Sequence, residues 1–122
     1  MAAIPAYAAT PKCGVAQIST ANANRDGTGA IVAVFPAGAS GSRIDAIDIK
    51  AVGTTTAGMI RLFIHDGANA RLLTEVPVVA VTPSATFPSW EAQLNTNSMS
   101  QILPLVLPSG YSLRASTEKP EL

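Results

Sequence analysis

The single histidine of this chain, His65, is followed by Asp66 and Gly67, and a His–Asp pair is where acid–base chemistry would be sought first. Neighbouring residues of a strand point to opposite faces, so the carboxylate of Asp66 is poorly placed to reach the imidazole. Asp-Gly is also a strong turn dipeptide. A metal site needs three or four converging ligands, and the sequence holds no second histidine. The triplet therefore predicts a turn with a surface histidine.

The other candidate motifs also favour structural roles. Asp45 and Asp48 would face opposite sides of a strand, so they do not form a carboxylate pair. The segment 26–29, Asp-Gly-Thr-Gly, lacks the repeated aspartates of a calcium loop and predicts a turn. The Gly38–Gly41 segment lacks the Lys-Ser/Thr of a phosphate loop. We expect no enzyme activity, no catalytic residue, no metal and no cofactor.

Composition limits the partners that the chain can bind. Eight basic and eight acidic residues cancel, and no cluster of Lys and Arg exists to attract nucleic acid or an anionic membrane. Only 13% of the residues are charged, against about 25% in a typical domain. Cys13 is the single cysteine, so no intrachain disulfide can form. Neutral polar residues or contacts with neighbours must therefore keep the surface soluble.

The chain predicts one all-β domain. Residues 1–13 carry Pro5 and Pro11 and predict an extended N-terminal arm without the basic region of a signal peptide. Residues 14–122 predict a two-sheet antiparallel β-sandwich, jelly-roll-like, because short apolar runs alternate with Gly, Pro and Asn turns. Eight strands are expected, at 14–20, 29–35, 43–52, 59–65, 72–82, 87–94, 102–107 and 111–117.

The run from Met59 to His65 is apolar on both faces of its predicted strand. Ile60, Leu62 and Ile64 alternate with a second set that contains Met59 and Phe63. One domain core buries one face, so the second face needs another partner. We expect a homo-oligomer, with a trimer favoured. The expected contact residues are Ile4, Tyr7, Met59 and Phe63.

Two further patterns predict which residues lie at sheet edges and which strand faces are exposed to solvent. Pro77 and Pro104 lie inside apolar runs, and proline removes a ladder donor, so both are expected at edges or bulges. The runs 47–51 and 111–115 alternate apolar and polar residues, which is typical of strands with one solvated face.

The segment 54–67, the strand-like run 73–79, the turn 82–86, Trp90 and the segment 107–116 together resemble a family of small virion proteins of tailed bacteriophages. The resemblance covers roughly residues 43–117. It implies a capsid decoration, or cement, protein that sits on the shell as a symmetric oligomer, with the major capsid protein or another virion protein as partner. It also implies assembly in the cytoplasm of the host bacterium.

Two alternatives stay open. A tail, neck or baseplate component would need the same strands and the same kind of interface. A glycan-binding module of a receptor-binding apparatus would instead use aromatic side chains as a stacking platform, and Phe87, Trp90 and Tyr111 are the candidates for it.

Overall fold

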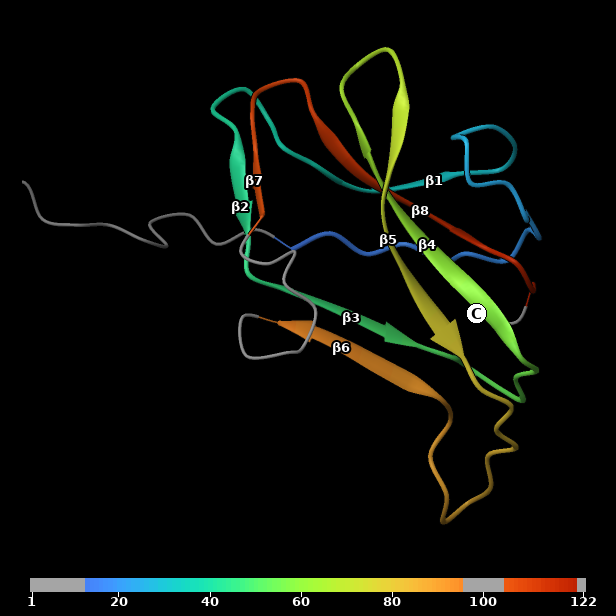
Figure 1. Cartoon of the computed structure of the whole chain (residues 1–122). Helices are drawn as coiled ribbons and strands as arrows, with labels where there is room; N and C mark the ends of the chain where they lie inside the picture. Colours follow the sequence, from blue (N-terminus) through green and yellow to red (C-terminus); the bar gives the residue numbers. More distant parts are fainter. Residues whose placement is uncertain (1–12, 96–104, 121–122) are drawn as a thin grey trace, which may run out of the picture.

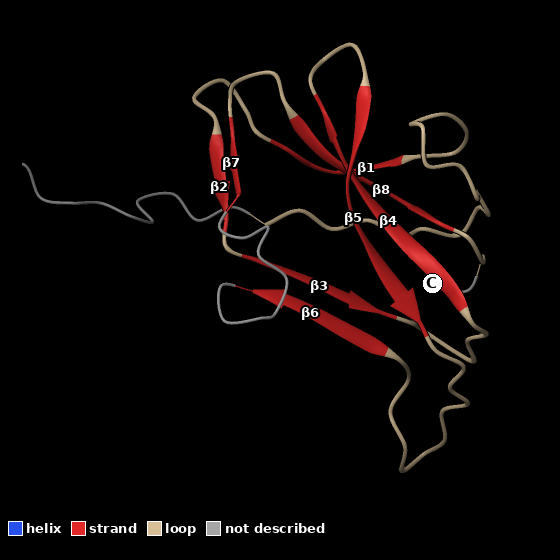
Figure 2. Cartoon of the chain, viewed as in Figure 1, coloured by secondary structure: helices blue, strands red, loops and turns tan. Residues whose placement is uncertain are grey.

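The computed structural model of the chain describes residues 13–95 and 105–120, where all regular elements are β-strands (Figure 1 and Figure 2). The eight strands are β1 (Val32–Pro36), β2 (Ser42–Ile44), β3 (Ala46–Lys50), β4 (Gly58–His65), β5 (Ala70–Val78), β6 (Glu91–Asn95), β7 (Leu105–Leu107) and β8 (Ser112–Thr117). This part of the chain contains no helix capable of crossing a bilayer. The expected all-β class is confirmed.

Strand β4 is the centre of the largest sheet. This four-stranded antiparallel sheet has the order β1-β8-β4-β5 (Figure 1). β4 pairs with β8 from Ile60 to His65 and with β5 along its whole length. The register with β5 shifts between Leu62 and Phe63, which pair with Thr74 and Leu72. A bulge of this kind increases the local twist of the sheet.

The expected strand 43–52 forms as two strands, β2 and β3. β2 pairs with β7 and β3 pairs with β6, both antiparallel. Asp45 lies between the two strands; it is exposed, and its carboxylate accepts a hydrogen bond of 2.7 Å from Arg43. The segment 42–50 therefore changes its pairing partner at Asp45, a solvated polar residue. The alternation of apolar residues along the sequence did not indicate this change.

The expected strand at 14–20 does not form. Its backbone joins the sheet through one parallel bridge just beyond it, between Ala21 and Thr117. Ile18 still points into the core and is 9% exposed. An apolar side chain can thus be buried in the core without its backbone pairing with another strand. The candidate arm residues Ile4 and Tyr7 lie outside the described residues, as does Pro104.

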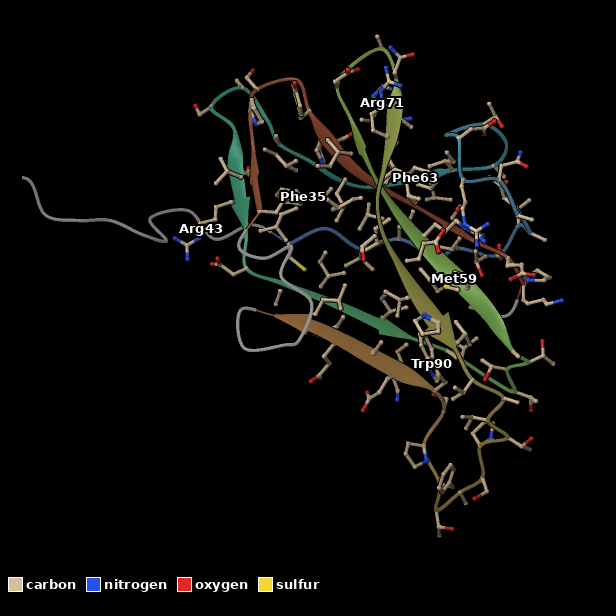
Figure 3. The ribbon with its side chains drawn as sticks, viewed as in Figure 1. Phe35, Arg43, Met59, Phe63, Arg71 and Trp90 are labelled. Carbon is tan, nitrogen blue, oxygen red and sulfur yellow. The ribbon has the colours of Figure 1, made fainter. Side chains whose placement is uncertain are left out.

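All three sheets contribute to one hydrophobic core. Ile60 and Leu62 of β4, at 0% and 2% exposed, lie at its centre. Other members of the core cluster are Ile44, Val76, Val78, Trp90, Leu94, Leu107, Leu113 and Ala115. Figure 3 shows Trp90 at the start of β6, facing the β4–β5 pair. Because strands from each sheet meet in this cluster, its apolar contacts hold the sheets together.

The edge and alternation predictions hold where the structure describes them. Pro77 is exposed on β5, an edge strand of the four-stranded sheet, as predicted. In β3, Ile47 and Ile49 are partly buried while Asp48 and Lys50 are exposed. In β8, Leu113 and Ala115 are buried while Ser112 and Arg114 are only partly buried. Beyond the predicted run, Ser116 is 0% exposed although it shares the face of Ser112 and Arg114, so that end of the face is covered.

Replacing Leu62 with Ala tests the core. The substitution removes buried methyl groups from the central strand and leaves a cavity, so we expect a loss of about 2–5 kcal/mol in the free energy of unfolding. Equilibrium denaturation in urea measures it. Val106→Ala, at a side chain that is 69% exposed, is the control and should cost less than about 0.5 kcal/mol. Equal losses in the two variants would contradict this assignment of the core.

Candidate functional site

The second face of β4 is buried. Arg61 is 3% exposed and Phe63 is 0% exposed, although their side chains point away from Ile60 and Leu62. Phe63 is not a member of the core cluster. A strand that is buried on both faces needs covering residues on each side of its sheet, as the apolar residues on both faces predicted.

A loop formed by residues 22–30 is closed at its base by Asn22, which is 7% exposed. The backbone N–H of Asn22 donates to the carbonyl of Thr117 at the end of β8, at 2.7 Å. Its side-chain amide donates to the carbonyls of Thr28 and Ala30 at 2.9 and 3.0 Å. Its side-chain oxygen accepts from the Asn24 N–H at 3.0 Å. These bonds fix both ends of the loop beside β8.

The tip of the 22–30 loop reaches β5. Arg25 forms an ion pair with Glu75 of β5, and the same carboxylate accepts a bond of 3.3 Å from the Nε of Arg61. Gly27 approaches β5 so closely that a Cβ there would lie 2.6 Å from the Ala70 carbonyl oxygen. Since β4 lies between β8 and β5, a loop that contacts both passes across the face of β4 on which Arg61 and Phe63 lie.

Phe63 is fully buried within the single chain. Its expected contact with another subunit stays a prediction, but none of its side chain is exposed in this structure. Met59, on the same face nearer the start of β4, stays partly exposed (Figure 3). The sequence reasoning overlooked Asn22 and Arg25, because the segment Ala-Asn-Ala-Asn-Arg-Asp-Gly reads simply as a turn.

The covered face carries an excess of positive charge. The Glu75 carboxylate faces two guanidinium groups, and the hydrogen bond from Arg25 is the main reason that its pKa lies below the usual value. Arg61 Nη1 and Ser116 Oγ are buried without a hydrogen bond to another described residue. Arg61 and Ser116 are also paired across β4 and β8. Glu75 is therefore the carboxylate that offsets the positive charges of Arg25 and Arg61.

Three of the exposed apolar side chains lie on the segments that follow β3, follow β5 and precede β6. Val52 is 82% exposed, Val79 is 57% exposed and Phe87 is 58% exposed. Their segments are tied together, because Thr55 donates its hydroxyl to the Val79 carbonyl at 2.8 Å and the Ala51 N–H donates to the Trp90 carbonyl at 2.8 Å. We call these three side chains the apolar end.

Phe87 belongs to the connection between β5 and β6, which projects away from the strands (Figure 1). Ser84 and Phe87 exchange two backbone hydrogen bonds, of 3.0 and 3.3 Å. Pro83 and Pro88 flank this small turn and fix two φ angles. The backbone of this turn is therefore restrained, while the phenyl ring of Phe87 is largely exposed.

The three aromatic residues considered for sugar stacking do not form one platform. Trp90 is 8% exposed and packs in the core. Phe87 is on the projection at the apolar end. Tyr111 follows the β7–β8 turn, where its N–H donates to the Pro108 carbonyl at 3.1 Å. Because Tyr111 lies near the other end of the large sheet, these residues cannot stack on one ligand.

The His65-Asp66-Gly67 turn forms as predicted. The Asp66 carboxylate accepts the backbone N–H groups of Asn69 and Ala68, at 2.8 and 2.9 Å, and these bonds lower its pKa. The Nδ1 of His65 accepts the Gly67 N–H at 3.1 Å. Asp66 is therefore committed to its own turn and does not orient the imidazole. In the parts of the chain that the structure describes, no three His, Cys, Asp or Glu residues gather at metal-binding distance.

Comparisons with protein-family models, with curated proteins and with solved structures give no match to this chain.

Replacing Asn22 with Ala tests the loop. The variant loses three side-chain hydrogen bonds at a buried position, and at roughly 1 kcal/mol for each bond we expect a loss of about 2–3 kcal/mol in the free energy of unfolding. Asn24→Ala, at an exposed residue of the same loop, is the matched control. If chemical denaturation gave equal stabilities for the two variants, the anchoring role of Asn22 would be refuted.

Replacing Glu75 with Gln tests the charge balance through pH. The folded-state pKa of Glu75 is lowered, so its contribution to stability is present above the usual glutamate value of about 4.3 and disappears as pH falls through the lower folded value. We expect wild type to be the more stable protein at neutral pH and this advantage to vanish in acid.

Thermal unfolding between neutral and acidic pH measures the difference. Glu91→Gln breaks an exposed pair with Lys50, in which the side chains are 55% and 54% exposed, and should show little of this pH dependence. A constant difference between wild type and Glu75→Gln at every pH would exclude the ionic role.

Proposed function

We propose that this chain is a structural virion protein of a tailed bacteriophage, a capsid decoration protein that stabilises the particle as a symmetric oligomer, with a trimer favoured. Its partners are further copies of itself and a major capsid or other virion protein, and it is assembled in the host cytoplasm. The class comes from the resemblance of residues 43–117 to small virion proteins, and the all-β fold agrees with it.

The proposal includes a jelly-roll-like sandwich of two layers. Its support is the continuity of β2 and β3, which makes the two small sheets successive parts of one bent ribbon. Residues of this ribbon and of the four-stranded sheet share the core cluster. In this description the ribbon with β6 and β7 forms one layer and the four-stranded sheet forms the other.

The observation that carries the proposal is the apolar end. Val52, Val79 and Phe87 expose apolar surface, and Phe87 belongs to a loop that projects from the strands (Figure 1). Burial of one such side chain contributes about 1.5–3 kcal/mol. Repeated around a symmetric ring, a few of these contacts stabilise an oligomer without any charged contact, which suits a chain with few charges.

The proposed interface therefore centres on Phe87 in place of Phe63. Met59 keeps partial exposure and remains a candidate at its border, and the arm residues Ile4 and Tyr7 remain candidates for a second contact. An exposed aromatic side chain on a restrained turn is the kind of residue that dominates protein interfaces, because it brings a large apolar area at little entropic cost.

Replacing Phe87 with Ser tests this function. We expect the wild-type protein to sediment as an oligomer, and Phe87→Ser to weaken self-association at least about tenfold, since roughly 1.4 kcal/mol already changes an association constant by that factor. Val79→Ser should act in the same direction. Analytical ultracentrifugation over a range of concentrations measures the effect. Val106→Ser, at an apolar residue of β7 that is 69% exposed, is the control.

A wild-type protein that stays monomeric at high concentration, and that does not bind phage particles lacking their accessory proteins, would refute the proposal. Electron microscopy of particles with bound protein distinguishes a capsid location from the tail, neck or baseplate alternative.

A further inference from the structure

The end of the large sheet opposite the apolar end contains an open hollow of about 470 Å³. Three turns meet around it, those between β1 and β2, between β4 and β5, and between β7 and β8. Its polar side chains are His65, Ser109, Tyr111, Ser112 and Arg114. None of the lining residues is an aspartate or a glutamate.

Arg114 and His65 lie on the same face of the sheet. Ser112 pairs with His65. Arg114, two residues further along β8, pairs with Phe63. Residues two apart on a strand share a face, and such diagonal neighbours have their Cβ atoms within about 8 Å. The guanidinium and the imidazole are therefore near enough for one small ligand to contact both.

Both groups keep hydrogen-bond donors for a ligand. Arg114 donates from Nε to the Ser112 hydroxyl at 3.2 Å and forms no ion pair with another described residue. The Nδ1 of His65 already accepts the Gly67 N–H, so in the neutral ring the proton is on Nε2, a donor. The carboxylate of Asp66, in the neighbouring turn, accepts hydrogen bonds from the backbone N–H groups of Ala68 and Asn69.

We propose that this hollow binds the carboxylate of an acidic sugar, such as a uronic acid unit of a surface polysaccharide. Arg114 forms the charge-assisted bonds to the carboxylate and His65 donates from Nε2. The hydroxyls of Ser109 and Ser112, which also line the hollow, offer polar contacts to the hydroxyl groups of a sugar ring. The site lies at the end of β4 away from Phe87, so it can act within the proposed oligomer.

The test titrates short oligomers of galacturonic acid, the corresponding neutral galactose oligomers, and inorganic phosphate at equal ionic strength by calorimetry. We expect the acidic oligomer to bind and the neutral oligomer to bind at least tenfold more weakly. Arg114→Gln should weaken binding of the acidic oligomer at least tenfold. Arg43→Gln is the control, because Arg43 of β2 pairs with Asp45 and does not line the hollow.

Arg114 is partly buried, so a second variant avoids any effect on folding. Ser109 is exposed on the β7–β8 turn. Ser109→Asp should repel the carboxylate and weaken binding at least tenfold more than Ser109→Asn, whose side chain has the same size but no charge. Absence of binding to the acidic oligomer would overturn the proposal. Equal binding of the neutral oligomer, or competition by phosphate at the same concentration as the sugar, would also overturn it.

Discussion

The structure depends on the burial of β4 from both sides. Its core-facing residues Ile60 and Leu62 belong to the core cluster to which all three sheets contribute, and Phe63 and Arg61 on its opposite face are also buried. An antiparallel sheet commonly has one face in contact with water. Here the 22–30 loop, anchored to β8 and reaching β5, passes across that opposite face of the central strand.

This cover explains the unusual chemistry of the outer face. Burying the charge of Arg61 is costly, and its ion pair with Glu75 offsets part of that cost, while Arg25 of the loop binds the same carboxylate. Gly27 permits the close approach to Ala70 that a side chain would prevent. The loop and the buried arginine therefore share one carboxylate on β5.

Much of the fold could be predicted from local patterns, because alternation and turn residues act within a few positions. Ile47 and Ile49 on the inner face, Pro77 at an edge and the Asp66 turn are all of this kind. The segment that passes across the face of Phe63 could not be predicted in this way. An apolar second face indicates that something covers it, but a polar loop and another subunit can both do so. The contacts that place the loop, from Asn22 to Thr117 and from Arg25 to Glu75, join residues far apart in sequence.

The two candidate surfaces are separated by β4 itself. Gly58, at its start, pairs with Val78 beside the apolar end, while His65, at its last position, lines the polar hollow. An eight-residue strand spans roughly 25 Å, so the two ends lie on different sides of a domain of this size. Contacts through Phe87 would therefore leave the hollow open to solvent. The same rigid strand, held by its loop, keeps an apolar surface suited to association apart from a polar surface suited to a ligand.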